Sequence, residues 1–309
     1  MSNLDNDIYE FNKIDAYNKL QEAVQYFCGE NKEQNFDKFM VLCKMSALQD
    51  NSHSQYIMGI FYEDGIEGLE KYFQTKIEAD EKYYKMTNSK KAMKWYEKSA
   101  NQGYKDAQYA LGNMYFKGID IDVDYEKALY WFKSSKTEFA CFYVGYLYEK
   151  GLGVNQDYNN AIKWYEKSAN LGYSDAQCNL GYIYQEGLGI EKNYEEAIRW
   201  YEKAIEQNES IAKSNLAEMY ILGHGVEVDY EKALSLYEDA LNDARIIDDE
   251  EEISIVLFNI AEMYEKGYGM KVDYEKAREL YEESASYGLE EAIEKLDNLK
   301  TKIKNNTTN

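Results

Sequence analysis

The feature that most limits how this chain can fold is internal repetition. Aligned on one small residue and the tyrosine three places after it, the sequence repeats six times. The anchor pairs are Gly59/Tyr62, Gly112/Tyr115, Gly145/Tyr148, Gly181/Tyr184, Ala217/Tyr220 and Ala261/Tyr264. Their spacings of 53, 33, 36, 36 and 44 residues indicate a basic unit with insertions in the first and fifth copies. Units of this size cannot bury their apolar faces alone, so they are expected to stack into a solenoid.

Both halves of each copy have the period of a helix. In the first half, Ala107, Leu111 and Tyr115 fall on one apolar stripe, and in the second half Ala128 and Phe132 do the same. The chain has four tryptophans, and all occupy one position of the second half, which predicts a packing role rather than a ligand site: Trp95, Trp131, Trp164 and Trp200.

A Gly-x-Gly separates the two halves in four copies: Gly151/Gly153, Gly187/Gly189, Gly223/Gly225 and Gly267/Gly269. A phosphate loop would need a preceding strand and a Gly-Lys-Ser/Thr, and neither occurs here. The glycines are instead expected to end the first helix with a positive φ. An Asp or Asn then starts the second helix, at Asp124, Asp157, Asn193, Asp229 and Asp273. The predicted fold is all-α, a right-handed α-α superhelical solenoid of antiparallel helix pairs.

The two ends of the chain are expected to cap this solenoid. Residues 37–59 align without gaps on residues 90–112, so they contain a second helix, and residues 9–28 would be the degenerate first helix before it. Residues 289–303 are predicted to form a polar capping helix, with a frayed tail at 304–309. The expected organisation is N-terminal capping helices at 1–53, six repeats at 54–288, and a C-terminal capping helix and tail at 289–309.

The charge balance excludes several functions. Lys+Arg number 35 and Asp+Glu 57, a formal net charge of −22, whereas nucleic-acid binding needs a basic surface. Two histidines, His53 and His224, leave little room for histidine-based catalysis or a metal site. We therefore expect no catalytic residue, no metal and no cofactor. The acidic run 248–252 is predicted to be a solvated loop rather than a calcium site.

Cysteine usage and the N-terminus indicate a reducing compartment. Cys28, Cys43, Cys141 and Cys178 form no Cys-x-x-Cys pair, so buried reduced thiols are expected. The first residues, MSNLDNDIYEFNKIDAYN, are acidic and lack the apolar core of a secretory signal. No apolar run reaches the ~18 residues of a membrane span. The prediction is a cytoplasmic protein, with leaderless export left open.

Together these residues carry a family resemblance. Ala-x-x-x-Leu-Gly-x-x-Tyr, then Gly-x-Gly, Asp-Tyr-x-x-Ala and Trp-Tyr-x-Lys, resembles the Sel1-like repeat, a relative of the tetratricopeptide repeat, over residues 37–297. Departures include Asp120 in place of a glycine, a lost Gly-Tyr after Lys136, and Ala217 and Ala261. The resemblance implies a non-enzymatic scaffold or adaptor that binds a protein or peptide.

By analogy with tetratricopeptide solenoids, the first helices would line a concave groove. Counted from the small residue, positions −3, +1 and +4 would point inward, and they vary between copies while the packing positions do not. The partner-binding residues predicted on this basis are Tyr56, Tyr109, Asn113, Phe116, Phe142, Tyr146, Tyr182, Glu218, Phe258 and Glu262. The middle of this set is aromatic and its end acidic, which favours a basic partner with apolar anchors. The alternatives are that tyrosine is merely abundant here and that the acidity only keeps the chain soluble.

Two other functions stay open. One family subgroup has been described as β-lactam-binding or β-lactamase-like, but it carries a cysteine pair in each repeat, which this chain lacks, and there is no Ser-x-x-Lys with Ser-Asp-Asn partners. The other is an exported effector that uses the same groove on a host protein.

Overall fold

The computed structural model describes residues 3–84 and 86–307, with side chains over 11–84 and 86–299. Within these residues the chain consists of helices joined by turns, and no strand occurs. The predicted all-α fold of helix pairs is confirmed. The elements are α1 (Asn3–Cys28), α2 (Phe36–Leu48), α3 (Ser52–Phe73), α4 (Glu81–Tyr84), α5 (Ser89–Asn101), α6 (Lys105–Lys117), α7 (Tyr125–Ser135), α8 (Glu138–Lys150), α9 (Tyr158–Asn170), α10 (Ser174–Glu186), α11 (Tyr194–Ile205), α12 (Ser210–Leu222), α13 (Tyr230–Ile247), α14 (Glu250–Lys266), α15 (Tyr274–Ser286) and α16 (Glu290–Thr307).

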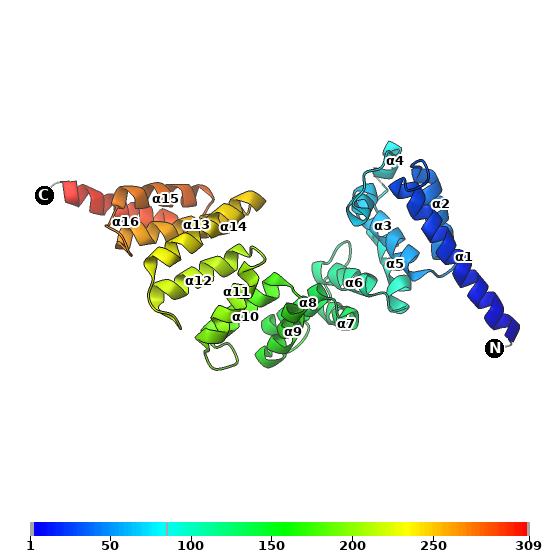
Figure 1. Ribbon diagram of the computed structural model, residues 1–309, viewed down its shortest axis with the longest axis horizontal. Helices are drawn as coiled ribbons and strands as arrows, with labels where there is room; N and C mark the ends of the chain where they lie inside the picture. Colours follow the sequence, from blue (N-terminus) through cyan, green and yellow to red (C-terminus); the bar gives the residue numbers. More distant parts are fainter. Residues whose placement is uncertain (1–2, 85, 308–309) are drawn as a thin grey trace. The chain divides into compact units, whose positions relative to one another are not determined.

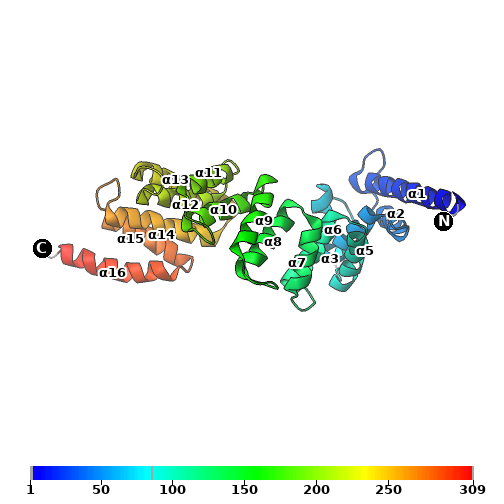
Figure 2. The same ribbon diagram turned by 90° about the horizontal axis from the view of Figure 1, so that it is seen from below.

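The helices form two compact units, which we call the N-terminal unit (Met1–Asp157) and the C-terminal unit (Tyr158–Asn309). The N-terminal unit contains the pairs α1/α2, α3/α5 and α6/α7, followed by α8 (Figure 1). The C-terminal unit starts with α9 and continues with the pairs α10/α11, α12/α13 and α14/α15 and then α16 (Figure 2). Within each unit, the second helix of a pair also packs against the first helix of the next pair.

Capping residues begin and end these helices as the sequence predicts. Asp124, Asn193, Asp229 and Asp273 are N-caps whose side chains accept a hydrogen bond from a backbone N–H three residues on. Helix α9 starts directly after Asp157. The first glycine of each Gly-x-Gly is a left-handed C-cap, with φ between 68° and 70° at Gly151, Gly187, Gly223 and Gly267.

The small residue of the first helix lies under an aromatic ring of the second helix. A Cβ built on Gly181 would lie 2.4 Å from the Tyr201 ring, and one on Gly112 would lie 2.5 Å from the Phe132 ring. These rings, not the tryptophans, fill the core. Of the four tryptophans only Trp200 is buried. The residue that follows each tryptophan is the fully buried one: Tyr96, Phe132, Tyr165 and Tyr201.

Both insertions extend helices. In the first repeat, α3 has a break at Gly65 (φ 69°) and continues to Phe73, and the short α4 follows. In the fifth repeat the extra residues lengthen α13 and α14. The prediction that run 248–252 is a solvated loop is therefore wrong for its second half. Residues 250–252 form the first turn of α14, and Glu252 is buried, with its Oε1 accepting a hydrogen bond from Ser214 Oγ at 2.7 Å.

The terminal helices are longer than expected. Helix α1 begins at Asn3 rather than at residue 9. Helix α16 continues to Thr307, past the predicted end at residue 303, and lies along α15 (Figure 2). None of the helices in the described residues has the length and apolar character needed to cross a bilayer.

Candidate functional site

The structure gives each predicted inward position a different environment. Position −3 is mainly a packing position. Tyr56 on α3 is half-buried, with its ring centroid 5.7 Å from that of Tyr72, 5.7 Å from Tyr96 and 5.1 Å from Tyr104. Burial raises the pKa of its hydroxyl. Its ring is thus part of an aromatic cluster in the N-terminal unit rather than a free binding surface.

Tyr109 and Phe116 on α6 belong to a second aromatic cluster of the N-terminal unit. Tyr109 lies 5.8 Å from the Phe132 ring and 6.2 Å from the Tyr143 ring, and burial raises its pKa to about 12. Phe116 lies 5.1 Å from Tyr143, and Tyr143 stacks on Phe132 at 5.1 Å with an interplanar angle of 14°. Phe142 extends the cluster, 5.6 Å from Tyr143.

Tyr143 is the centre of this cluster, and the sequence analysis missed it. It occupies position −2, and from there it reaches positions −3 and +4 of the preceding first helix, Tyr109 and Phe116. The same geometry recurs in the C-terminal unit, where Asn215 Nδ2 at position −2 lies 3.9 Å from Cys178 Sγ at position −3 of α10. A signal was available. Position −2 varies as strongly as the chosen positions, with Ile57, Ala110, Tyr143, Asn179, Asn215 and Asn259.

Position +4 contacts the buried ring of the second helix. The hydroxyl of that ring donates to the +4 side chain, as from Tyr96 to Glu63 at 2.6 Å, from Tyr201 to Gln185 at 2.9 Å and from Tyr281 to Glu265 at 2.9 Å. Where the second helix has Phe132, position +4 has Phe116, and their centroids lie 6.3 Å apart. A polar +4 residue therefore satisfies a buried hydroxyl, and its variation reflects packing rather than a partner.

Position +1 includes the two exposed residues of the three positions, although Ile60 at this position in the first pair is buried. In the N-terminal unit, Tyr146 is half-buried beside Phe116, with centroids 6.0 Å apart. Asn113 is half-buried too, and its Oδ1 is enclosed without a hydrogen-bond partner in the described part of the chain. In the C-terminal unit, Tyr182 is 49% exposed and Glu218 is exposed.

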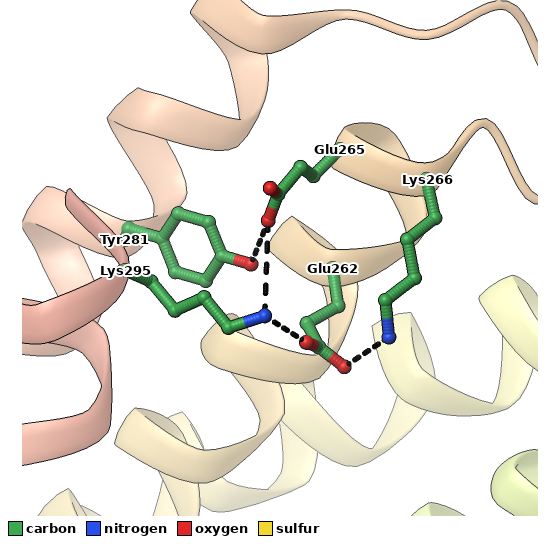
Figure 3. A network of polar contacts seen from close by, with 5 residues as sticks. All are labelled: Glu262, Glu265, Lys266, Tyr281 and Lys295. Atoms are coloured by element: carbon green, nitrogen blue, oxygen red, sulfur yellow. Dashed lines mark hydrogen bonds and ion pairs between the residues drawn. The ribbon is translucent and has the colours of Figure 1, made fainter. Parts of the chain in front are cut away.

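Of the two acidic residues in the predicted set, Glu262 is neutralised within the chain (Figure 3). Glu262 on α14 pairs with Lys266 Nζ at 2.8 Å and with Lys295 Nζ of α16 at 2.6 Å. Lys295 also lies 3.9 Å from Glu265 and 6.0 Å from the centroid of Phe258. Burial alone would raise the pKa of Glu262, but the hydrogen bonds from the two lysines outweigh it and hold that pKa below its ordinary value. Glu262 and Phe258 are thus already engaged.

The described residues give no sign of a nucleophilic or metal-binding site on the first helices. Cys43, Cys141 and Cys178 are buried, and burial raises the pKa of the Cys43 thiol to about 12. Among residues 11–84 and 86–299, whose side chains the structure describes, His, Cys, Asp and Glu form no group of three that could hold a metal. The arrangement presents rings, amides and carboxylates on helix faces, which suits recognition of another surface.

Comparison with known proteins identifies the repeat. The Sel1 repeat model matches residues 52–72, 85–104, 105–136, 139–173, 174–209, 210–242 and 254–288. The chain belongs to the Sel1 repeat family. The first two matched segments are the two helices α3 and α5 of one pair, separated by the insertion. A search of the curated proteins gives no match.

Solved Sel1 repeat proteins share this fold. The protective antigen c5321 of uropathogenic Escherichia coli, which has an SLR fold, matches with a TM-score of 0.73 and 26% identity, over 97% of this chain and 59% of that one. This chain thus spans less than two thirds of that antigen's length. A Sel1 repeat protein from Oxalobacter formigenes matches with a TM-score of 0.65 and 22% identity, over 92% of this chain and 76% of that one. Sel1 repeat proteins are in general protein-interaction scaffolds.

Proposed function

We propose that this chain is a non-enzymatic scaffold that binds a protein or peptide through the first helices of its pairs, chiefly at position +1. One observation carries the proposal. Positions −3 and +4 are largely taken up by packing, while Tyr182 and Glu218 at position +1 stand open to solvent. An exposed ring and an exposed carboxylate offer a partner an apolar contact and an ionic contact, which are the contacts that protein interfaces use.

The N-terminal unit would offer a preformed aromatic surface. Tyr146 and Phe142 rest on Phe116 and Tyr143, so their rings are already held in place and binding would cost little conformational entropy.

The negative charge of the chain favours a positively charged partner. A formal net charge of −22 would accelerate encounter with a basic partner, and this effect would weaken with salt over a screening length of ~10 Å. We therefore propose a partner that carries lysine or arginine together with apolar anchors.

The experiment compares matched tyrosine variants as baits. Tyr146→Ala/Tyr182→Ala removes the position +1 rings, and Tyr17→Ala/Tyr130→Ala removes two rings that are 55% and 63% exposed on other faces. We leave Tyr109 in place because its ring supports Phe132 and Tyr143. Wild type and the control pair are expected to retain the same partner proteins from the producing cell, and the position +1 pair to lose them while keeping its circular-dichroism spectrum.

Equal recovery of the same proteins by all three baits would overturn the proposal. The β-lactam alternative has a separate test. Incubation of the purified chain with a chromogenic β-lactam is expected to give no colour change above buffer, and turnover would replace the scaffold proposal by an enzymatic one.

A further inference from the structure

Two glutamates occupy the same repeat position in the C-terminal unit and have opposite surroundings. Glu218 on α12 and Glu262 on α14 both follow the small residue directly. Glu262 is bound by Lys266 one turn later on α14 and by Lys295 of α16 (Figure 3). Asp297 of α16 aligns with Ala261, the small residue of α14, so Lys295 occupies position −2. Helix α16 thus supplies, from within the chain, the cation that this position binds.

Glu218 has neither lysine. Leu222 stands where α14 has Lys266, and Asn259 stands where α16 has Lys295. In the part of the chain that the structure describes, the Glu218 carboxylate has no ion pair and no hydrogen bond, and its side chain is exposed. Leu222, one turn along the same face, is 51% exposed although it is apolar. The position therefore combines an unpaired anion with an uncovered apolar side chain.

The groups around Glu218 make this face electronegative. Burial raises the pKa of the Tyr237 hydroxyl, and Glu218, Glu262 and Glu252 raise it further. Burial also raises the pKa of the Tyr201 hydroxyl, to which Glu218 and the half-exposed Tyr182 both contribute. Glu218 and Tyr182 thus act on the same buried tyrosine from neighbouring first helices, α12 and α10.

We propose that Glu218 binds a lysine or arginine side chain of the protein partner, with Leu222 and Tyr182 in contact with the apolar part of the same segment. The proposal rests on the proposed scaffold function and deepens it by naming the recognised group. Lys295 shows how this position holds a cation. Its Nζ lies 2.6 Å from the Glu262 carboxylate and over the face of the Phe258 ring at 6.0 Å, so carboxylate and ring act on one ammonium group.

The first test measures binding of a defined probe. A short fluorescein-labelled peptide of lysine, leucine and serine is titrated against the full chain at low ionic strength, and the same peptide with glutamine for lysine serves as the uncharged probe. Glu218→Gln is compared with Glu238→Gln, which removes the same charge from an exposed position of the second helix α13. We expect Glu218→Gln to weaken binding of the lysine peptide about tenfold and Glu238→Gln to change it less than twofold. Equal losses in both variants would show that only the overall charge acts, and would overturn the proposal.

The second test fills the site from within. Asn259→Lys places a lysine where α16 carries Lys295, so it is expected to pair with Glu218 and displace the peptide. The affinity for the lysine peptide should fall about as far as in Glu218→Gln, while Asn259→Gln leaves it unchanged. An unaltered affinity in Asn259→Lys would contradict the proposed geometry.

These tests separate the two proposals. If Tyr146→Ala/Tyr182→Ala loses the cellular partner but Glu218→Gln retains it with full affinity, the scaffold function stands and the cation site is wrong. If the partner bound by wild type is retained by every variant, the scaffold proposal fails as well.

Discussion

Ten of the eleven phenylalanines of this chain lie in the N-terminal unit, and the C-terminal unit has only Phe258. Charge is distributed the other way. Residues 1–157 hold 19 Lys+Arg and 25 Asp+Glu, whereas residues 158–309 hold 16 and 32, so −6 and −16 make up the total of −22. Both units bury a ring of the second helix in the helix pair. The N-terminal unit adds phenylalanines to it, whereas the C-terminal unit packs mainly aliphatic side chains around it and carries more carboxylates.

The difference shows what each kind of filling requires. Rings pack on rings, so the N-terminal unit needs no charge compensation around Phe132, Phe116 and Tyr143. Carboxylates near a core must each be stabilised separately. In the C-terminal unit Glu252 is buried with a raised pKa, Glu262 is held by two lysines, and Glu218 stays in solvent. Glu218 is the carboxylate that we propose for a partner.

The largest expected effect is on the ring-filled unit. Phe132→Ala removes a fully buried ring that Tyr109, Phe116 and Tyr143 contact, and it is expected to cost about 3–5 kcal/mol of unfolding free energy. The measurement is urea unfolding combined with hydrogen exchange resolved by segment, because repeat arrays need not unfold as one unit. Tyr130→Ala, on the same helix but 63% exposed, is the control and should change little. Equal losses would mean that the aromatic cluster is not what stabilises this unit.

The next effect concerns the raised pKa of Glu252. Burial is the largest cause, with Asp249 and Glu209 adding to it against the Ser214 hydrogen bond. Because the folded state holds the proton more tightly than the unfolded state, stability falls as pH rises from the unfolded pKa through the folded one. Glu252→Gln keeps an acceptor for Ser214 and removes this dependence.

We expect Glu252→Gln to gain about 1 kcal/mol over wild type at neutral pH and to match it in acid. Thermal unfolding at several pH values measures the difference. The neighbouring Glu251→Gln, which is exposed, should follow the wild-type curve. A Glu252→Gln variant less stable than wild type at neutral pH would show that the carboxylate is satisfied as an anion.

Glu262, ten residues later on α14, is expected to show the opposite pH dependence. Its folded pKa is lowered, so its contribution is present above the unfolded pKa and is lost as pH falls through the folded pKa. Lys295→Met keeps the apolar stem over Phe258 and should cost about 0.5–1 kcal/mol at neutral pH and low salt, since the pair is partly exposed. The loss should shrink in acid and in high salt. A loss unaffected by either would assign Lys295 a packing role alone.

Sequence reasoning predicted the helix pairs because three independent signals coincided: the apolar period, the Asp and Asn caps, and the glycine stops. It failed where a side chain's role depends on the next repeat. Tyr143 and Lys295 both act from position −2 on the preceding first helix, and a comparison made within one repeat does not show that contact.

The candidate site was predictable as a set of positions but not as a set of free residues. The variable positions were found, yet variation at −3 and +4 reflects packing against Tyr104, Phe132 or a buried hydroxyl. Only exposure separates these from Tyr182 and Glu218. The acidic run 248–252 shows the same limit, because its charge suggested solvent while the helical extension buried Glu252.

The smallest expected effect distinguishes binding from packing most directly. Tyr182 is 49% exposed, and its removal should leave stability within about 0.5 kcal/mol of wild type. Tyr109, the ring at position −3 of the N-terminal unit, is half-buried against Phe132 and Tyr143, so Tyr109→Ala should cost several times more. Urea midpoints of Tyr109→Ala and Tyr182→Ala, measured side by side, give the comparison. If Tyr182→Ala proves as destabilising as Tyr109→Ala, the Tyr182 ring stabilises the folded state by packing. The proposal that the first helices bind a partner through position +1 would then be wrong.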